Sequence, residues 1–337
     1  MKVTVSLPAK LPTKGITELH GVVGGPYGVA PLSDFADGTL CFLLRNDPAE
    51  ATRCLSAQVS NAALIIRRSC LAQVEGEFTK KFIEKNLIIA TDDSPRGLFS
   101  RIVETALSRG HNLLKPSNVS PAEDHPSVAK TANVAPSARL GSRTLVGDGA
   151  LIGEGVVIGP DCVIGERAII FDGVQMGASV NIGSGSIIGN RVNAFEPSEG
   201  GTGWNDIVQV GGLVIGSDVR IGALAVINAG TLTDTVIGNH IRIGDRAVIA
   251  HNCHVADGAV VLTAATVAGS VKIGAKAWIS PGCAINSKIK IGDAAFIGIG
   301  CVVTDDVPAG ARLLPTFSMS SEDALGLRRL LQEQRKM

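Results

Sequence analysis

Aromatic side chains are scarce in this chain, where phenylalanine, tryptophan and tyrosine together make up 4% of 337 residues. A core without rings must be built from small aliphatic side chains, which together with 40 glycines indicates a repeat architecture. The chain is also longer than a single core usually fills, so we expect more than one structural unit.

Net charge and long apolar runs are missing as well. Lys+Arg and Asp+Glu both number 31, so the formal net charge is zero and neither nucleic acid nor an anionic membrane surface is an expected partner. No apolar run reaches the roughly 18 residues of a membrane-spanning helix, and residues 1–15 contain no apolar segment of signal-peptide length. The sequence therefore predicts a cytoplasmic protein with no transmembrane segment.

An aliphatic residue instead recurs at every sixth position, in one register from Val128 to Ile188 and in a second from Ile237 to Val303. A period of six does not fit one face of an α-helix. Three short strands of six residues each, however, make an 18-residue triangular coil whose inward side chains stack on one another. We therefore predict a mainly β protein built on a left-handed parallel β-helix of hexapeptide repeats.

A small residue stands two positions before most of these aliphatic residues, and four of the seven cysteines occupy this slot. The other three cysteines show no C-x-x-C spacing. Disulfides and a zinc cluster are therefore not expected, and the cysteines are interpreted as small core residues. The four cysteines in the repeat slot are Cys162, Cys253, Cys283 and Cys301.

These patterns divide the chain into three segments that differ in their sequence pattern. Residues 1–120 hold strand-like runs ("TLCFLL", "ALIIR", "NLIIA") and one helix beginning at Ser94–Pro95, which predicts a small α/β domain. Residues 121–310 form the β-helix, and residues 311–337 form a C-terminal extension with a short helix. Between the two registers, residues 190–212 break the period and predict a loop extruded from the coil, where binding residues commonly lie. Ile227, Leu232 and Ile237 are spaced by five and predict one tightened turn.

The 18-residue coil makes it possible to predict which residues are neighbours, because residues 18 apart in the sequence should lie about 4.8 Å above one another on successive coils. His251 then lies below Gly269, and Ser287 lies one coil further on. A histidine beside a backbone amide without a side chain suits acyl transfer, since the imidazole can take a proton and the N–H can bind an oxyanion.

Other interpretations of the histidines stay open. His254 falls in a different column, with Lys272 and Lys290, so the two histidines are poorly placed to share a metal ion and no metal site is predicted. Taken by itself, His251 is equally consistent with a solvated corner residue.

The segment Gly211–Gly274 resembles the UDP-3-O-(3-hydroxyacyl)glucosamine N-acyltransferases of lipid A biosynthesis, on the motifs "TDTVIGN", "IAHN" and "VAGSVKIG" in that order. The N-terminal "GVAPLSDFADGTLCFL" is similar to the uridine-binding domain of the same family. This resemblance implies a homotrimer with sites between neighbouring β-helices and an acyl carrier protein thioester as donor. It also implies His251 as general base and Gly269 as oxyanion donor, with no cofactor.

The chain departs from the family pattern at several substrate positions. It keeps Phe42 and Asn46 in "FLLRNDPAEA" but lacks the tyrosine of the family motif, and Lys288 stands where a second histidine is expected. The acidic residue that precedes the base is shifted by one position to Asp245. The complete set of substrate-binding candidates is Phe42, Asn46, Asp245, Asn252, His254, Ser287 and Lys288.

Three functions therefore remain in view. The first is transfer of a 3-hydroxyacyl chain from acyl carrier protein to the amine of a UDP-sugar. The second is an acetyl- or acyltransferase acting on another amino sugar or on a hydroxyl, with acetyl-CoA as a possible donor, and the third is a trimeric scaffold that has lost catalysis. For an acidic carrier protein, the candidate docking residues are Lys272, Lys276, Lys290, Arg328 and Arg329.

Overall fold

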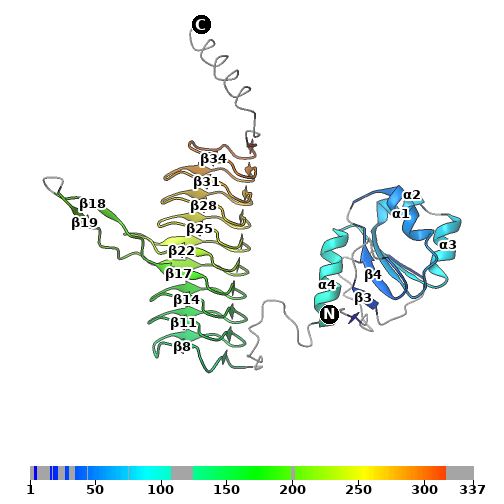
Figure 1. Ribbon diagram of the computed structural model, residues 1–337, viewed down its shortest axis with the longest axis horizontal. Helices are drawn as coiled ribbons and strands as arrows, with labels where there is room; N and C mark the ends of the chain where they lie inside the picture. The colour runs from blue at the N-terminus through cyan, green and yellow to red at the C-terminus, as the bar shows by residue number, and fades with distance from the viewer. Residues whose placement is uncertain are drawn as a thin grey trace, which may run out of the picture. The chain divides into compact units, whose positions relative to one another are not determined.

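The structure is a computed structural model that describes residues 4–5, 16, 18–21, 27–29, 35–43, 45–74, 76–107, 124–198 and 202–315. The chain divides into two units, Met1–Leu113 and Leu114–Met337 (Figure 1). Within the described ranges, no helix has both the length and the apolar character needed to span a membrane.

The first unit is an α/β layer structure. Its six-stranded sheet has the order β1-β3-β4-β5-β6-β2, with β3 to β6 parallel and β1 and β2 antiparallel to their neighbours. The strands are β1 (Thr4–Val5), β2 (Glu18–Gly21), β3 (Tyr27–Val29), β4 (Thr39–Phe42), β5 (Ala63–Arg67) and β6 (Leu87–Thr91). The helices are α1 (Pro48–Leu55), α2 (Arg68–Val74), α3 (Glu77–Ile83) and α4 (Pro95–Leu107).

Successive side chains along the central strands point to opposite faces of this sheet, and both faces are apolar. On β5, Leu64 and Ile66 pack against the side of α1, α2 and α3, whereas Ala63 and Ile65 pack against the side of α4. Ser94 caps α4 by accepting a hydrogen bond from the N–H of Gly97 at 3.3 Å, in agreement with the predicted helix start.

The second unit is the predicted β-helix, seen in Figure 1 as a stack of coils. Its strands form three parallel sheets, one on each side of the triangle. The first sheet contains β7 (Ser127–Val128), β10 (Leu145–Val146), β13 (Val163–Ile164), β16 (Asn181–Ile182), β21 (Arg220–Ile221), β24 (Arg242–Ile243), β27 (Val260–Val261), β30 (Trp278–Ile279), β33 (Phe296–Ile297) and β35 (Arg312–Leu313).

The second and third sheets complete the triangle. The second contains β8 (Asn133–Val134), β11 (Leu151–Ile152), β14 (Ile169–Ile170), β17 (Ile187–Asn190), β22 (Val226–Asn228), β25 (Val248–Ile249), β28 (Thr266–Val267), β31 (Ala284–Ile285) and β34 (Val302–Val303). The third contains β9 (Arg139–Leu140), β12 (Val157–Ile158), β15 (Gln175–Met176), β20 (Leu213–Ile215), β23 (Thr235–Ile237), β26 (His254–Val255), β29 (Lys272–Ile273) and β32 (Lys290–Ile291).

The core is a column of the periodic residues, with the second residue of most strands pointing inward and buried. The four cysteines of the repeat are buried among them, and burial raises the pKa of Cys162 and Cys253 to about 11. These thiols therefore stay protonated at neutral pH and serve as packing groups. The helix predicted within residues 311–337 lies outside the described residues, which end at residue 315.

Three corners join the sheets. The first corner leads from the first sheet to the second, the second corner leads from the second sheet to the third, and the third corner leads back to the first sheet.

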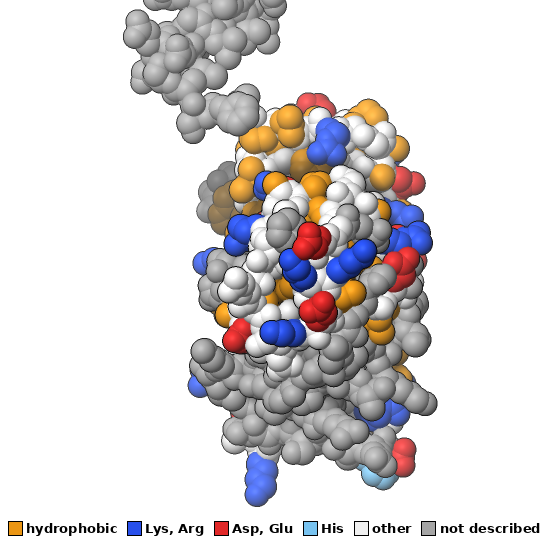
Figure 2. Space-filling view, turned by 90° about the vertical axis from the view of Figure 1, so that its right-hand side faces the viewer, with side chains coloured by type: hydrophobic (Ala, Val, Ile, Leu, Met, Phe, Trp, Pro, Cys, Tyr) orange, Lys and Arg blue, Asp and Glu red, His pale blue; other side chains and the backbone are white. Residues whose placement is uncertain are grey.

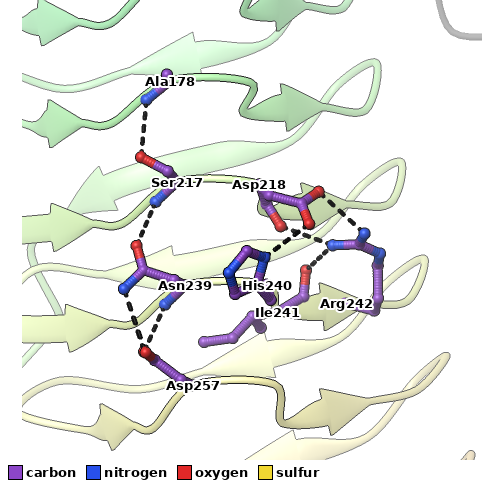
Figure 3. A network of polar contacts seen from close by, with 8 residues as sticks. All are labelled: Ala178, Ser217, Asp218, Asn239, His240, Ile241, Arg242 and Asp257. Atoms are coloured by element: carbon purple, nitrogen blue, oxygen red, sulfur yellow. Dashed lines mark hydrogen bonds and ion pairs between the residues drawn. The ribbon is translucent and has the colours of Figure 1, made fainter.

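At the corners, side chains from one coil cap backbone N–H groups of the coil before it. In Figure 3, at the third corner, Asp257 accepts from Asn239 N–H at 2.7 Å, and Asn239 accepts from Ser217 N–H at 2.8 Å. The bond from the Asn239 N–H is the main cause that lowers the pKa of Asp257.

Several glycines of the repeat leave room for these caps. A Cβ on Gly238 would lie 2.4 Å from the capping Oδ1 of Asp257, so a side chain there would exclude the cap. Beside this ladder, Asp218 accepts a hydrogen bond from His240 and pairs with Arg242, and both lower the pKa of Asp218.

Two insertions leave the coil, and both lie at the second corner. Between β17 and β20, residues 191–198 and 202–212 belong to a projecting arm that carries the antiparallel pair β18 (Phe195–Pro197) and β19 (Trp204–Asp206) (Figure 1). This is the extruded loop predicted from the broken period. Between β22 and β23, Ala229–Asp234 form a second insertion, which we call the wide turn.

The wide turn corrects the prediction of a tightened turn around Leu232. Ile227 and Ile237 both face the core, but Leu232 is 75% exposed and belongs to no strand. The corner is therefore lengthened by four residues rather than shortened, and Leu232 projects outward.

Candidate functional site

His251 and Gly269 meet at the second corner, one coil above the wide turn. His251 follows β25 and Gly269 follows β28, and these strands pair in register. A methyl group built on Gly269 would lie 2.5 Å from His251 Nε2 and 2.6 Å from Cε1, so the imidazole lies against the glycine. The structure therefore brings together the two residues that the 18-residue spacing had placed in one column.

The side chain of Asn252 determines which imidazole nitrogen carries the proton. Its Oδ1 lies 2.9 Å from His251 Nδ1 and also accepts the backbone N–H of Thr231 at 3.1 Å. Its Nδ2 donates to the carbonyl oxygen of Thr233 at 2.7 Å. An N–H can only donate and a carbonyl can only accept, so the amide has one consistent orientation, with Oδ1 facing the histidine.

It follows that Nδ1 of His251 is the donor in this pair and carries a hydrogen. In the neutral ring, Nε2 is then unprotonated, and this is the nitrogen that lies against Gly269. A neutral imidazole with a free Nε2 is the form required of a general base.

The N–H of Gly269 lacks the cap found at several other corners. At some equivalent positions a carboxylate from the next coil covers the N–H, as Asp245 does for Ala223 at 2.8 Å and Asp293 does for Ala275 at 2.8 Å. Above Gly269 the corresponding residue is Ser287, and within the described residues the Gly269 N–H has no hydrogen-bond acceptor. Buried backbone N–H groups are nearly always paired, so this amide, on a buried glycine, is suited to an incoming acceptor.

Ser287 and Lys288 lie at the same corner, two coils beyond His251, and both are exposed. His254 faces outward from the third sheet, where the pairings His254 with Lys272 and Lys272 with Lys290 form the predicted column. All three of these side chains are exposed.

The remaining β-helix candidates lie away from His251. Asp245 lies at the first corner of the same coil, where it caps Ala223 and does not join the histidine within this chain. Lys276 lies at the third corner, at the opposite edge of the third sheet from Lys288. Arg328 and Arg329 lie outside the described residues.

In the first unit, the two nucleotide-binding candidates have protein partners. Phe42 is half-buried against Phe99 of α4, with ring centroids 4.8 Å apart. Asn46 follows β4 and lies 3.4 Å from the hydroxyl of Ser69. Phe42 therefore contributes to the core beneath α4.

The threonines within and directly after the wide turn were missed from the sequence. Thr231 and Thr233 contact the side chain of Asn252, and Thr235 Oγ1 accepts its backbone N–H at 2.8 Å. The alternation in "GTLTDTVIG" is a signal that could have drawn attention to them, because alternate residues share a side of an extended chain. In the described part of the chain, no group of three or more His, Cys, Asp or Glu residues is placed to hold a metal ion.

Comparison with known solved structures bears on the fold. Solved structures with a similar fold include the UDP-N-acetylglucosamine O-acyltransferase of Moraxella catarrhalis, with a TM-score of 0.52 and 24% sequence identity. The similarity covers 60% of this chain and 77% of that one. The UDP-N-acetylglucosamine acyltransferase of Campylobacter jejuni gives a TM-score of 0.50 and 25% identity over the same shares of the two chains. These similarities confirm the predicted left-handed β-helix.

Curated relatives share a shorter segment. The UDP-3-O-acylglucosamine N-acyltransferase of Coxiella burnetii is 52% identical over 67 residues, which is 20% of this chain and 20% of the relative. The protein of the same name from Pseudomonas fluorescens is 42% identical over 67 residues, or 20% of this chain and 19% of the relative. The matched segment thus spans about a fifth of the length of these relatives. No family model matches the chain.

The coils, the three parallel sheets and the structural neighbours define the class: this is a hexapeptide-repeat protein with a left-handed β-helix. Within that class, the motif resemblance is confirmed, since a segment of about a fifth of the chain is similar to the UDP-3-O-acylglucosamine N-acyltransferases.

Proposed function

We propose that the protein is an acyltransferase that moves a 3-hydroxyacyl chain from acyl carrier protein to the amine of a UDP-sugar, as in lipid A biosynthesis. The observation that carries the proposal is the pairing of a basic His251 Nε2 with the uncapped amide of Gly269. The match to curated N-acyltransferases supports it. By the same analogy the working enzyme is a cytoplasmic homotrimer that needs no cofactor.

The residues suggest how the reaction proceeds. The amine nitrogen attacks the thioester carbonyl carbon, while His251 Nε2 takes a proton from that nitrogen. The carbonyl oxygen becomes an oxyanion and accepts a hydrogen bond from the Gly269 N–H. When the carbon–sulfur bond breaks, the proton on Nε2 passes to the leaving sulfur, which yields the amide and a free thiol.

Replacing His251 is the direct test. We expect His251→Ala to lower kcat by about 10²- to 10⁴-fold, which is the contribution typical of general acid–base catalysis. The melting temperature should change little, because the imidazole is outside the aliphatic column. The pH dependence of the residual activity should also differ from that of the unchanged protein, because the group that takes the proton is gone.

The control is His125→Ala, which removes an exposed histidine just before β7, at the start of the β-helix. Full activity in His251→Ala would exclude the base assignment, whereas absence of transfer activity in the unchanged protein would favour the catalytically lapsed scaffold. Unfolding of that variant would show that the imidazole is structural.

A second candidate function is favoured by one observation. Phe42 is occupied by Phe99, and the chain lacks the family tyrosine near it, so the acceptor could carry a different head group from uridine. This candidate is acyl or acetyl transfer to another amino sugar or to a hydroxyl, with acetyl-CoA as donor. Assays that cross acyl carrier protein thioesters and acetyl-CoA with UDP-sugars and other amino sugars distinguish the two functions.

A further inference from the structure

Thr231, in the wide turn, contacts the residue that orients the candidate base without contacting the base itself. Its hydroxyl donates to Asn252 Oδ1 at 2.7 Å and its backbone N–H donates to the same atom at 3.1 Å. We infer that Thr231 is a positioning residue that acts through Asn252 to keep the proton of His251 on Nδ1. This inference deepens the proposed function and rests on it.

The first step is geometric. Asn252 Oδ1 has three polar neighbours, which are the hydroxyl and N–H of Thr231 and the Nδ1 of His251. On the other side of the amide, Nδ2 contacts the carbonyl and hydroxyl oxygens of Thr233 at 2.7 and 3.0 Å. The two threonines therefore hold the amide from both sides and prevent it from turning.

The second step concerns what holds Thr231. Its carbonyl oxygen accepts two backbone N–H groups from the base of the arm, from Val210 at 2.7 Å and from Gly211 at 2.8 Å. The next backbone pair, Gly230 N–H to the oxygen of Gly212 at 2.9 Å, fixes the turn on its other side. The insertion that breaks the repeat thus anchors the turn that contacts Asn252.

The third step is chemical. If Asn252 loses its orientation, Nδ1 of His251 loses its acceptor and the neutral ring is free to carry its hydrogen on Nε2. A protonated Nε2 cannot take a proton from the acceptor substrate. A loosened Thr231 should therefore reduce the fraction of enzyme in the competent tautomer, which lowers kcat and leaves KM unchanged.

Thr231→Val is the variant that tests this, because it keeps the shape and the backbone contacts and removes only the hydroxyl. We expect kcat to fall about 3- to 10-fold, in line with the loss of one hydrogen bond of about 0.5–1.5 kcal/mol. KM should not change, and Thr231→Ser should restore kcat because serine keeps the donor. The matched control is Thr131→Val, which removes a threonine hydroxyl bonded to Asp148 at the first corner.

A second readout does not depend on activity. In protein labelled with ¹⁵N-histidine, the side-chain nitrogen shifts of His251, identified by their absence in His251→Gln, report which nitrogen is protonated. We expect the Nδ1–H form in the unchanged protein and in Thr231→Ser, and a measurable population of the Nε2–H form in Thr231→Val. Should Thr231→Val not fold, Thr231→Ala is measured in its place.

The two hypotheses can fail separately. If no donor and acceptor pair reacts but Thr231→Val shifts the tautomer, the proposed function is wrong and the positioning role stands. If the tautomer and kcat in Thr231→Val both match the unchanged protein, the backbone contacts suffice and the positioning role of the hydroxyl is overturned.

Discussion

At the scale of single residues, the site depends on one missing side chain and one fixed amide. Gly269 leaves room for the imidazole of His251, and Asn252 determines which nitrogen of that ring carries the hydrogen. Neither residue is chemically reactive by itself. The candidate chemistry arises because the coil places them on either side of His251.

Gly269→Ala tests the close approach. The added methyl group would lie 2.5 Å from His251 Nε2, so the ring must move away from the amide. We expect kcat to fall by at least about tenfold, as for a displaced catalytic group, with a small decrease in melting temperature. Activity assays and thermal unfolding of the purified variant measure both effects.

Gly76→Ala is the matched control, because nothing lies within 4 Å of a methyl group there and its φ is not in the left-handed region. If Gly269→Ala kept full activity, the imidazole could not need this contact, and the proposed oxyanion site would have to be sought elsewhere.

At the scale of the structural elements, the repeat and the projecting arm were predictable and the wide turn was not. A period of six fixes which residues face inward, so the strands, their register and the column His254–Lys272–Lys290 follow from counting. Counting cannot show whether Leu232 faces inward, because an aliphatic residue in an insertion looks the same as one in a strand. The contacts of Thr231 with Asn252 depend on that insertion, so they were out of reach as well.

The corners have a second property that the period does not reveal. Many of them place a residue other than glycine at positive φ, including Ala264 at 58° and Ala294 at 52°. Such a conformation costs an L-residue about 1–2 kcal/mol. Asn252, at 57°, belongs to the same series, so the site residue adopts the ordinary corner conformation.

We expect Ala264→Gly to stabilise the protein by about 0.5–1 kcal/mol, because relief of the strained φ exceeds the extra chain entropy of glycine. Ala264 is exposed, so little packing is lost. Denaturant unfolding measures the change. Ala284→Gly, at an exposed position within β31, is the control and should destabilise by a similar amount. Equal destabilisation by both changes would contradict the strain argument.

At the scale of the whole molecule, the balance of charge hides local differences. Formal net charge is zero, and Figure 2 shows basic and acidic side chains interspersed on the face that it draws. The outward column of the third sheet is different, since its last three strands carry His254, Lys272 and Lys290. An acidic partner would meet this end of the sheet preferentially.

Reversing Lys272 and Lys290 together to glutamate tests this surface as the docking site of an acyl carrier protein. Both side chains are exposed and point away from the core, so folding should be unaffected. We expect KM for the carrier-bound donor to rise about tenfold with little change in kcat, because rim charges act mainly on association. Raising the salt concentration should weaken binding of the donor to the unchanged protein in the same way, since exposed charges are screened over about 8–10 Å.

Arg139→Glu is the matched control, because Arg139 is exposed in the same sheet at its far end, on β9. An unchanged KM at low salt in the double variant, or an equal rise in the control, would show that the lysine column does not dock the donor.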